Sequence, residues 1–198
     1  LGPRTFDLVM AMYGRLRFVA QVMKKRTPRF ISVGGVGVYR GWINLAPDDP
    51  VLIPIPEDAP LQDQPDVDKF SYRMVEAEWA VMEAHKEGCY NATHFRYPMI
   101  YGPRQLAPRE WSIVRRILDS RQRLILLDGG LTIESRGYAE NMAHALMLAV
   151  DNPRACAGQI YNVRDDGLLT TKDWVRVIAN MMGHRFEFVE MPYALGRP

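Results

Sequence analysis

The sequence is poor in cysteine: only Cys89 and Cys156 occur among its 198 residues. Two cysteines are too few for a disulfide framework, which excludes the small secreted domains that depend on one. The sequence also has no uninterrupted apolar run long enough to cross a bilayer, because charges or prolines break each candidate. These two absences predict a protein of the reducing cytoplasm that has no membrane partner.

The sequence also has little net charge. Its 25 Lys and Arg balance 23 Asp and Glu, which leaves +2 at pH 7. The cations are scattered, and their one tight cluster, Lys24–Arg26, suits the end of a helix. We therefore expect no nucleic-acid partner. The histidines have no metal-ligand spacing, so we assign no metal site; they are His85, His94, His144 and His184.

Strand and helix patterns alternate along the chain. Residues 7–12 form a short apolar run typical of a buried strand, 15–26 carry apolar residues at helical spacing, and 30–33 are a second strand. This order predicts a βαβ unit in a parallel sheet. The further expected elements are a long loop over 41–68, a helix over 72–86, a strand over 94–98, a helix over 109–121 that buries Trp111, Val114, Ile117 and Leu118, a hairpin of 123–127 with 131–133, a helix over 138–150, a strand over 159–163, a helix that begins with a capping box at 170–173 and ends at Met182, and a strand over 185–191.

The stretch 96–104, Arg-Tyr-Pro-Met-Ile-Tyr-Gly-Pro-Arg, follows a β-prone run and contains breakers of regular structure. Pro98 ends the strand, and Gly102-Pro103 opens a turn. In open parallel α/β sheets, ligands bind beyond the carboxyl ends of the strands. The stretch therefore predicts a ligand-binding loop, although a buried strand with an ordinary turn explains the spacing equally well.

Several motifs occur in a familiar order, and together they resemble the NAD-dependent epimerase/dehydratase family, an extended and here atypical branch of the short-chain dehydrogenases. The resemblance covers essentially the whole chain. It implies an α/β fold: the C-terminal part of a Rossmann-like, doubly wound parallel sheet with a small α/β substrate-binding region. The motifs are Tyr39-Arg40-Gly41, Glu57–Pro60, Tyr72, the 96–104 stretch, Arg136-Gly137-Tyr138 and Gly158–Val163.

By the same resemblance, residues 1–104 belong to an NAD(P)-binding domain. Residues 105–198 are mostly the substrate-binding region, with 136–163 returning to the sheet. NAD or NADP is the implied cofactor, and the substrate is a sugar nucleotide or a related small molecule. The implied cofactor contacts are Tyr13, Gly14, Gly35, Tyr72, Pro98, Met99 and Ile100. A helix cap with its turn, or core packing, is the competing explanation for most of these residues.

Arg104 and Arg136 are the expected substrate-binding residues. They match the family's substrate side, and arginine binds phosphate bidentately. Solvated surface arginines are the common alternative.

The sequence departs from the family pattern at its start. The family begins with a strand and a Gly-rich turn that holds the cofactor pyrophosphate at a helix N-terminus. Nothing before Asp7 matches this turn, so the resemblance implies that the chain lacks the family's first three strand–helix units. The glycines at 34–37 are no substitute, because no helix follows them and no acidic ribose partner stands at the expected distance.

The expected catalytic pattern is also altered. Tyr72 matches the family's acid/base tyrosine, but Glu76 stands where the family has lysine, and Gly35 stands at its hydroxyl position. A phenol needs a nearby cation to ionise near neutral pH. A second register, aligned on Glu78, places Phe70 and Met74 at the tyrosine and lysine positions. Both registers predict that the usual proton relay is absent.

These observations leave alternatives open. The chain is either an NAD(P)-dependent epimerase-, dehydratase- or reductase-like oxidoreductase or isomerase with atypical catalytic residues, or a non-catalytic binding protein of that family. The resemblance implies a homodimer through the helices at 15–26 and 72–86. The strand at 7–12 is expected at an open sheet edge, which predicts a strand-paired oligomer as the alternative.

Overall fold

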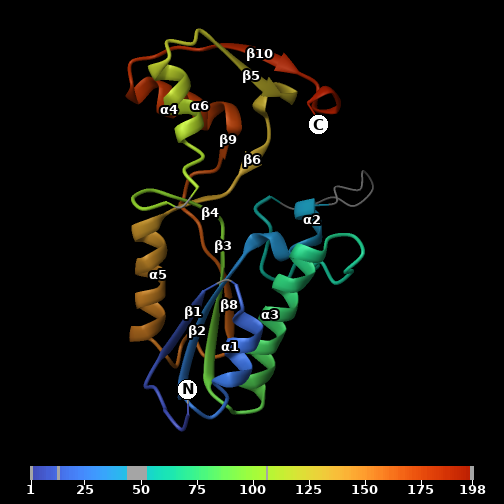
Figure 1. Ribbon diagram of the computed structural model, residues 1–198, viewed down its shortest axis with the longest axis vertical. Helices are drawn as coiled ribbons and strands as arrows, with labels where there is room; N and C mark the ends of the chain where they lie inside the picture. The colour runs from blue at the N-terminus through green and yellow to red at the C-terminus, as the bar shows by residue number, and fades with distance from the viewer. Residues whose placement is uncertain (1, 13, 44–52, 106, 197–198) are drawn as a thin grey trace. The chain divides into compact units, whose positions relative to one another are not determined.

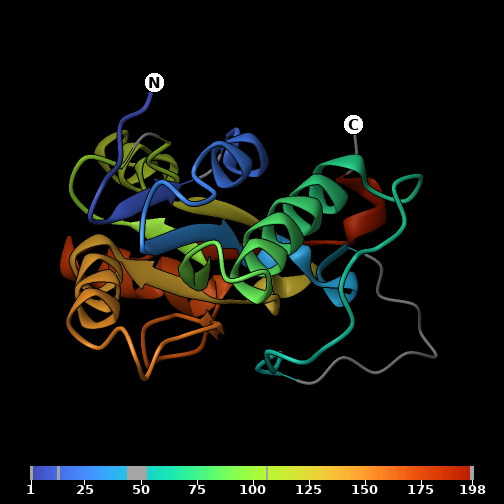
Figure 2. The ribbon, with the colours of Figure 1, turned by 90° about the horizontal axis from the view of Figure 1, so that it is seen from below.

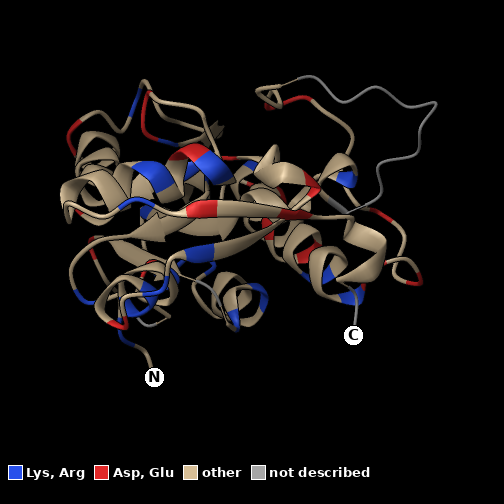
Figure 3. Ribbon diagram, turned by 90° about the horizontal axis from the view of Figure 1, so that it is seen from above, with Lys and Arg blue, Asp and Glu red and all other residues tan. Residues whose placement is uncertain are grey.

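The computed structural model describes residues 2–12, 14–43, 53–105 and 107–196. The chain divides into two compact units (Figure 1). The first comprises residues 1–98 and 141–163, and the second comprises residues 99–140 and 164–198. Lys and Arg are interspersed with Asp and Glu along the ribbon (Figure 3).

The first unit contains a four-stranded, wholly parallel sheet in the order β1-β2-β3-β8. Strands β2 and β3 are buried along almost their whole length, as expected for a parallel sheet covered on both faces. The expected α/β fold with a parallel sheet is therefore confirmed. The strands are β1 (Val9–Met12), β2 (Arg29–Gly35), β3 (Asn91–Tyr97) and β8 (Gln159–Asn162).

Helices α1 (Leu16–Val22) and α3 (Lys69–Lys86) cover one face of this sheet, and α5 (Ala139–Asp151) covers the other (Figure 2). Small residues of α1 and α3, such as Ala20 and Ala84, let the helices approach the strands closely. The Phe30 ring stacks on Tyr90 with centroids 4.8 Å apart.

Asp68 is the N-cap residue that fixes the start of helix α3. The Asp68 carboxylate accepts hydrogen bonds from the backbone N–H groups of Phe70 and Ser71, which satisfies two free donors of the first turn. No helix in the described part of the chain is both long and apolar enough to cross a membrane.

Residues 41–68 were expected to be a long loop. The segment between β2 and α3 contains two short helices, η1 (Val36–Val38) and α2 (Arg40–Ile43), and α2 overlaps the start of the predicted loop; the described part after it, 53–68, forms no strand of a sheet. Backbone hydrogen bonds attach this part to η1 and to the start of α2: Gln62 N donates to Val38 O at 2.7 Å, and Arg40 N donates to Pro60 O at 2.9 Å. The rest of the predicted loop, 44–52, lies outside the described residues.

The second unit is built from short elements around a separate apolar core. The core is supplied by α4, β5 and α6, with Ile113, Ile117, Leu124, Val175 and Phe186 among its buried members. The elements are β4 (Met99–Tyr101), α4 (Trp111–Leu118), β5 (Arg123–Leu127), η2 (Asp128–Gly130), β6 (Ile133–Glu134), β7 (Arg136–Tyr138), β9 (Leu169–Thr170), α6 (Thr171–Met181), β10 (Glu187–Met191) and η3 (Tyr193–Leu195).

The capping box at the start of α6 is confirmed: the Thr170 hydroxyl accepts from Asp173 N at 3.1 Å. The hairpin expected for 123–127 and 131–133 is wrong. Strand β5 pairs in parallel with β10, and β6 pairs antiparallel with β9. Gly129 and Gly130 adopt φ values of 66° and 69° within η2, and this turn leads the chain away from β5.

The predicted buried face of α4 is also partly wrong. Ile113 and Ile117, one turn apart, point into the core, whereas Trp111 is 50% exposed and Leu118 is 61% exposed. One apolar stripe on so short a helix holds only residues about four apart. Residues 111 and 118, seven apart, share another face of the helix and remain at the surface.

A buried polar network joins α3 to the sheet of the first unit. The Arg96 guanidinium donates to both carboxylate oxygens of Glu78, with its Nε at 2.8 Å and its Nη2 at 2.6 Å. Arg96 also donates to the Tyr39 hydroxyl, which donates to Asn162 Oδ1 at 2.7 Å. Burial raises the pKa of Tyr39, while the Arg96 charge opposes this effect.

His94 lies at the other side of Glu78. Its Nδ1 is 2.7 Å from Ser32 Oγ, and its Nε2 is 3.5 Å from Glu78 Oε2. The ring lies so close to Gly34 that a Cβ there would be 2.8 Å from His94 Nε2, so only glycine fits without rearrangement. Burial lowers the pKa of His94 to about 4; the Glu78 charge opposes the change, and the Arg96 charge adds to it.

This environment predicts that stability depends on His94 in mildly acid solution. At pH values between 6.5, the ordinary pKa of histidine, and about 4, its pKa in the folded protein, His94 is protonated in the unfolded chain but neutral in the folded chain. The stability contributed by neutral His94 is thus fully present above pH 6.5 and falls as the pH drops toward 4, by about 3 kcal/mol in total. Denaturant titrations at a series of pH values in this range measure the free energy of unfolding. In His94→Gln, this free energy should no longer show the part of its pH dependence that comes from His94. An unchanged pH dependence in the variant would contradict the prediction.

Candidate functional site

Three of the residues expected to contact a cofactor lie along one edge of the first unit's sheet. Gly14 follows β1, Gly35 ends β2 and Pro98 follows β3. Because these strands are adjacent and parallel, their carboxyl ends form one continuous edge. Gly14 has φ 66°, and no heavy atom of the described residues, its chain neighbours aside, lies within 4 Å of the position a Cβ would take, so the space beside it is open. Tyr13 lies outside the described residues.

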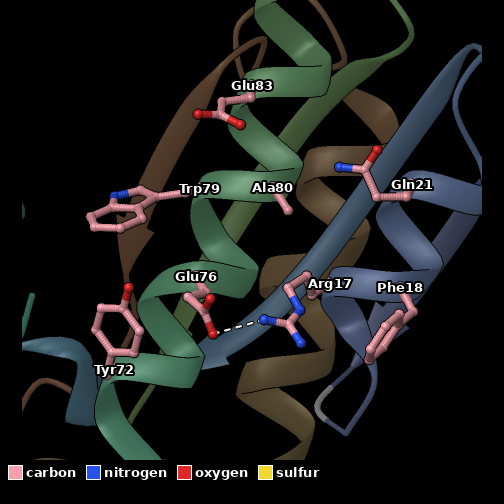
Figure 4. A pocket seen from close by; sticks show the side chains of 8 residues that line it. All are labelled: Arg17, Phe18, Gln21, Tyr72, Glu76, Trp79, Ala80 and Glu83. Carbon is pink, nitrogen blue, oxygen red and sulfur yellow. Dashed lines mark hydrogen bonds and ion pairs between the residues drawn. The ribbon is translucent and has the colours of Figure 1, made fainter. Parts of the chain in front are cut away.

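Helix α3 turns Ser71 and Met74, but not Tyr72, toward the turn that follows β2. A Cβ on Gly37 would lie 2.9 Å from Met74 Cε and 3.9 Å from Ser71 Oγ. Tyr72 instead lines a groove between α1 and α3 together with Phe18 and Trp79 (Figure 4). The structure thus places Tyr72 on a different face of α3 from the residues that contact the β2 turn.

Glu76, expected at the position of the family's lysine, lies in the same groove. Its carboxylate accepts a hydrogen bond from Arg17 Nη1 of α1 at 2.8 Å (Figure 4). The cation in this groove is therefore paired with a carboxylate. This arrangement differs from the tyrosine–lysine pair that stabilises a phenolate.

The second unit contains a cavity of about 400 Å³. Its walls come from β4, α4, β5, β6, β7 and α6 and from the residues that lead into α4 and α6. Met99 and Ile100, expected beside a nicotinamide ring, line this cavity. The lining is apolar over much of its area and carries five charged side chains; these are Arg109, Glu110, Arg116, Glu134 and Arg136.

Arg136, one of the two expected substrate-binding residues, lies in the wall of this cavity. Its guanidinium carbon stands 4.4 Å from the centre of the Trp174 ring, a cation–π contact. Its Nη2 donates a hydrogen bond to Glu134, two residues earlier. Its Nη1 is buried and has no hydrogen-bond partner among the described residues. Arg104, the other expected residue, is exposed in the turn after β4 and is not among the residues that line the cavity.

Glu110 contributes a second unsatisfied atom. Its Oε2 is buried without a hydrogen-bond partner in the described part of the chain. Leaving a buried polar atom unpaired costs about 1–3 kcal/mol. Arg29 Nε and Arg40 Nε, in residues that do not line this cavity, are unpaired in the same way among the described residues. An unpaired acceptor and an unpaired donor thus belong to residues of one cavity, where water or a ligand can supply partners.

Tyr101 contacts Trp174, one of the residues that line the cavity. Its hydroxyl donates to Asp165 Oδ2 at 2.9 Å, and its ring meets Trp174 edge-on with centroids 5.0 Å apart. Burial and the hydrogen bond to Asp165 raise the pKa of Tyr101 to about 12. Tyr101 is therefore a neutral donor at physiological pH, and it holds Trp174 under Arg136.

The sequence indicated Arg136 but missed Trp174, Glu110 and Glu134 as parts of a site. Trp174 carried only the pattern of a core or interface residue, and the two glutamates carried no motif. The cavity suits an anionic ligand with an apolar or aromatic portion. No group of three metal-ligating side chains occurs in the part of the chain that the structure describes.

Comparison with known proteins identifies the family of the chain. Residues 12–163 match the NAD dependent epimerase/dehydratase family, which is more than half of the chain. The chain belongs to this family. No curated protein matches the sequence.

Solved structures of epimerases and dehydratases share the fold of this chain at low sequence identity. The UDP-glucuronic acid 4-epimerase of Bacillus cereus, in complex with UDP-glucuronic acid and NAD, matches with a TM-score of 0.69 and 16% identity, over 89% of this chain and 53% of its own. The dTDP-glucose 4,6-dehydratase of Bacillus anthracis, in complex with NAD, gives 0.66 and 16%, over 90% and 55%. RMD of Pseudomonas aeruginosa, complexed with NADPH, gives 0.73 and 15%, over 97% and 71%.

The chain thus spans about half the length of the first two of these structures. Identities of 15–16% establish the Rossmann-type α/β fold of the family and nothing finer.

Proposed function

We propose that the chain forms part of an NAD(P)-dependent epimerase- or dehydratase-like oxidoreductase or isomerase, and that its second-unit cavity binds the diphosphate of a sugar nucleotide. One observation carries the proposal: Arg136 is held against Trp174 in a cavity of about 400 Å³ and has a buried, unpaired Nη1. Arginine is well suited to phosphate oxygens because its planar donors match them. The related B. cereus structure, which holds UDP-glucuronic acid and NAD, supports a ligand of this class.

The dinucleotide is proposed to lie along the carboxyl edge of the first unit's sheet. Gly14, Gly35 and Pro98 fit this group, because two of them have no side chain and all three stand at adjacent strand ends. The open space beside Gly14 allows the close approach of a ligand. When bound, the cofactor supplies hydride transfer.

The proton-transfer groups are proposed to be atypical. Gly35 has no hydroxyl, and Tyr72 lies in the α1–α3 groove, where Arg17 is paired with Glu76. The same observation favours a second candidate function: a non-catalytic member of the family that binds a sugar nucleotide without turnover.

Replacing Arg136 with glutamine should weaken the binding of UDP-glucuronic acid by tenfold or more, roughly the loss of one hydrogen bond to a charged group. Isothermal titration calorimetry measures this directly. Arg123→Gln is the matched control, because Arg123 lies in the same unit, is exposed and pairs with Glu187. Equal weakening in both variants would show a general charge effect and would contradict the assignment of the cavity. GDP- and dTDP-sugars in the same assay define the preferred nucleotide.

Turnover separates the two candidate functions. Incubation with NAD or NADP and the tightest-binding sugar nucleotide, followed by mass spectrometry and NMR of the products, detects epimerisation, dehydration or reduction. Because Tyr72 lines the groove, we expect any activity to survive Tyr72→Phe within about twofold, against the roughly 10²- to 10⁴-fold loss typical of a missing acid/base group. Binding without product would support the non-catalytic function.

The groove between α1 and α3 is proposed as the interface of a homodimer. It is lined by aromatic and charged side chains of both helices (Figure 4), and Phe18 and Trp79 are 58% and 42% exposed. Burying such aromatic residues is a common source of interface energy. The alternative contact is the β1 edge of the sheet, where Met10 and Met12 are exposed.

Two charge insertions distinguish these contacts. Phe18→Glu should convert the dimer into monomers if the helices form the interface, whereas Met10→Lys should leave it intact. Size-exclusion chromatography with light scattering measures the mass of each variant. The reverse result would assign the contact to the β1 edge, and a monomeric parent protein would contradict both contacts.

A further inference from the structure

Glu134 is hydrogen-bonded to the Arg136 guanidinium, the group that is proposed to bind the phosphates of the ligand. Its carboxylate accepts a hydrogen bond from Arg136 Nη2, and the two side chains are 26% and 12% exposed. Both residues line the same cavity. The Glu134 carboxylate therefore stands where an anionic ligand would meet Arg136.

Arg136 has other means of being held in place. Its backbone pairs with Met99 in the β4–β7 ladder, and its guanidinium lies on the Trp174 ring. The Trp174 ring is in turn held by Tyr101. These contacts orient the arginine from its backbone and from its flat face, and Glu134 is not needed for either.

The remaining hydrogen-bonding capacity of the guanidinium is divided. Nη2 is engaged by Glu134, while Nη1 is buried without a partner among the described residues. A phosphate that binds arginine bidentately takes two adjacent N–H donors. Nη2 carries two N–H donors and Glu134 takes one of them, so a phosphate that binds through that donor requires Glu134 to move aside.

We propose that Glu134 is an internal competitor for Arg136: it holds Nη2 in the ligand-free protein and yields it to a phosphate oxygen of the bound nucleotide. This inference rests on the proposed function of the cavity and adds a residue that sets its affinity. The cavity has three cations, Arg109, Arg116 and Arg136, against two carboxylates, Glu110 and Glu134, a balance of +1. Neutralising Glu134 raises the balance to +2 and frees Nη2.

The test is calorimetric titration of the whole chain with UDP and with GDP. Glu134→Gln should bind the nucleoside diphosphate roughly five- to tenfold more tightly than the parent protein, because a like charge near the bound anion is removed. Glu187→Gln is the matched control. It removes an exposed carboxylate of the same unit, outside the cavity, and should leave the affinity unchanged.

Circular dichroism melting establishes that each variant is folded. Should Glu134→Gln fold poorly, Glu134→Asp replaces it: its shorter side chain withdraws the carboxylate from Nη2, and a smaller gain in affinity is expected. A simple positioning role predicts the opposite sign, a loss of affinity in both variants.

Binding by the parent protein with an unchanged or weaker affinity in the folded Glu134 variants would overturn this inference alone. Absence of binding by the folded parent and the folded variants would overturn the proposed function, and this inference with it.

Discussion

The buried ion pair of Arg96 and Glu78 is the interaction on which the first unit depends. The two side chains are 3% and 2% exposed, and the pair joins the middle of α3 to β3. Removing two charges from water costs several kcal/mol each, which only good geometry and further hydrogen bonds recover. Both carboxylate oxygens accept from Arg96, and the guanidinium also reaches the Tyr39 hydroxyl and the backbone oxygen of Glu57.

This pair also shapes the edge that the cofactor is proposed to occupy. Arg96 immediately precedes Tyr97 and Pro98, so it fixes the end of β3 against α3. The Glu57 carboxylate accepts from Asn162 N at the end of β8, which attaches the segment around residue 57 to the same edge. The buried network and this exposed hydrogen bond thus position a helix, two strand ends and a connecting segment together.

The polar groups of the second-unit cavity differ from those around Arg96 in how completely they are hydrogen-bonded. Buried donors and acceptors around Arg96 have partners, whereas Arg136 Nη1 and Glu110 Oε2 have none among the described residues. A satisfied buried network stabilises a fold, and unsatisfied atoms in a cavity favour a ligand that completes them. The contrast is between the network around Arg96 and the cavity, and not between the two units, because Arg29 Nε and Arg40 Nε of the first unit are also buried without a partner among the described residues.

The sequence by itself determined the local elements and the fold class. The apolar runs at β1 and β2, the helical spacing of α3 and the Thr170 cap are local patterns, and they suffice to predict these elements. The expected burial of the strand at 7–12 is wrong, because Met10 and Met12 are exposed at the edge of the sheet. Tertiary structure alone decided the parallel pairing of β5 with β10, because the residues that pair are more than 60 positions apart in the sequence. It also decided the direction of Tyr72, since adjacent residues on a helix point about 100° apart, and the meeting of Glu110, Glu134 and Trp174 in one cavity. These features depend on contacts between distant segments, which no local pattern encodes.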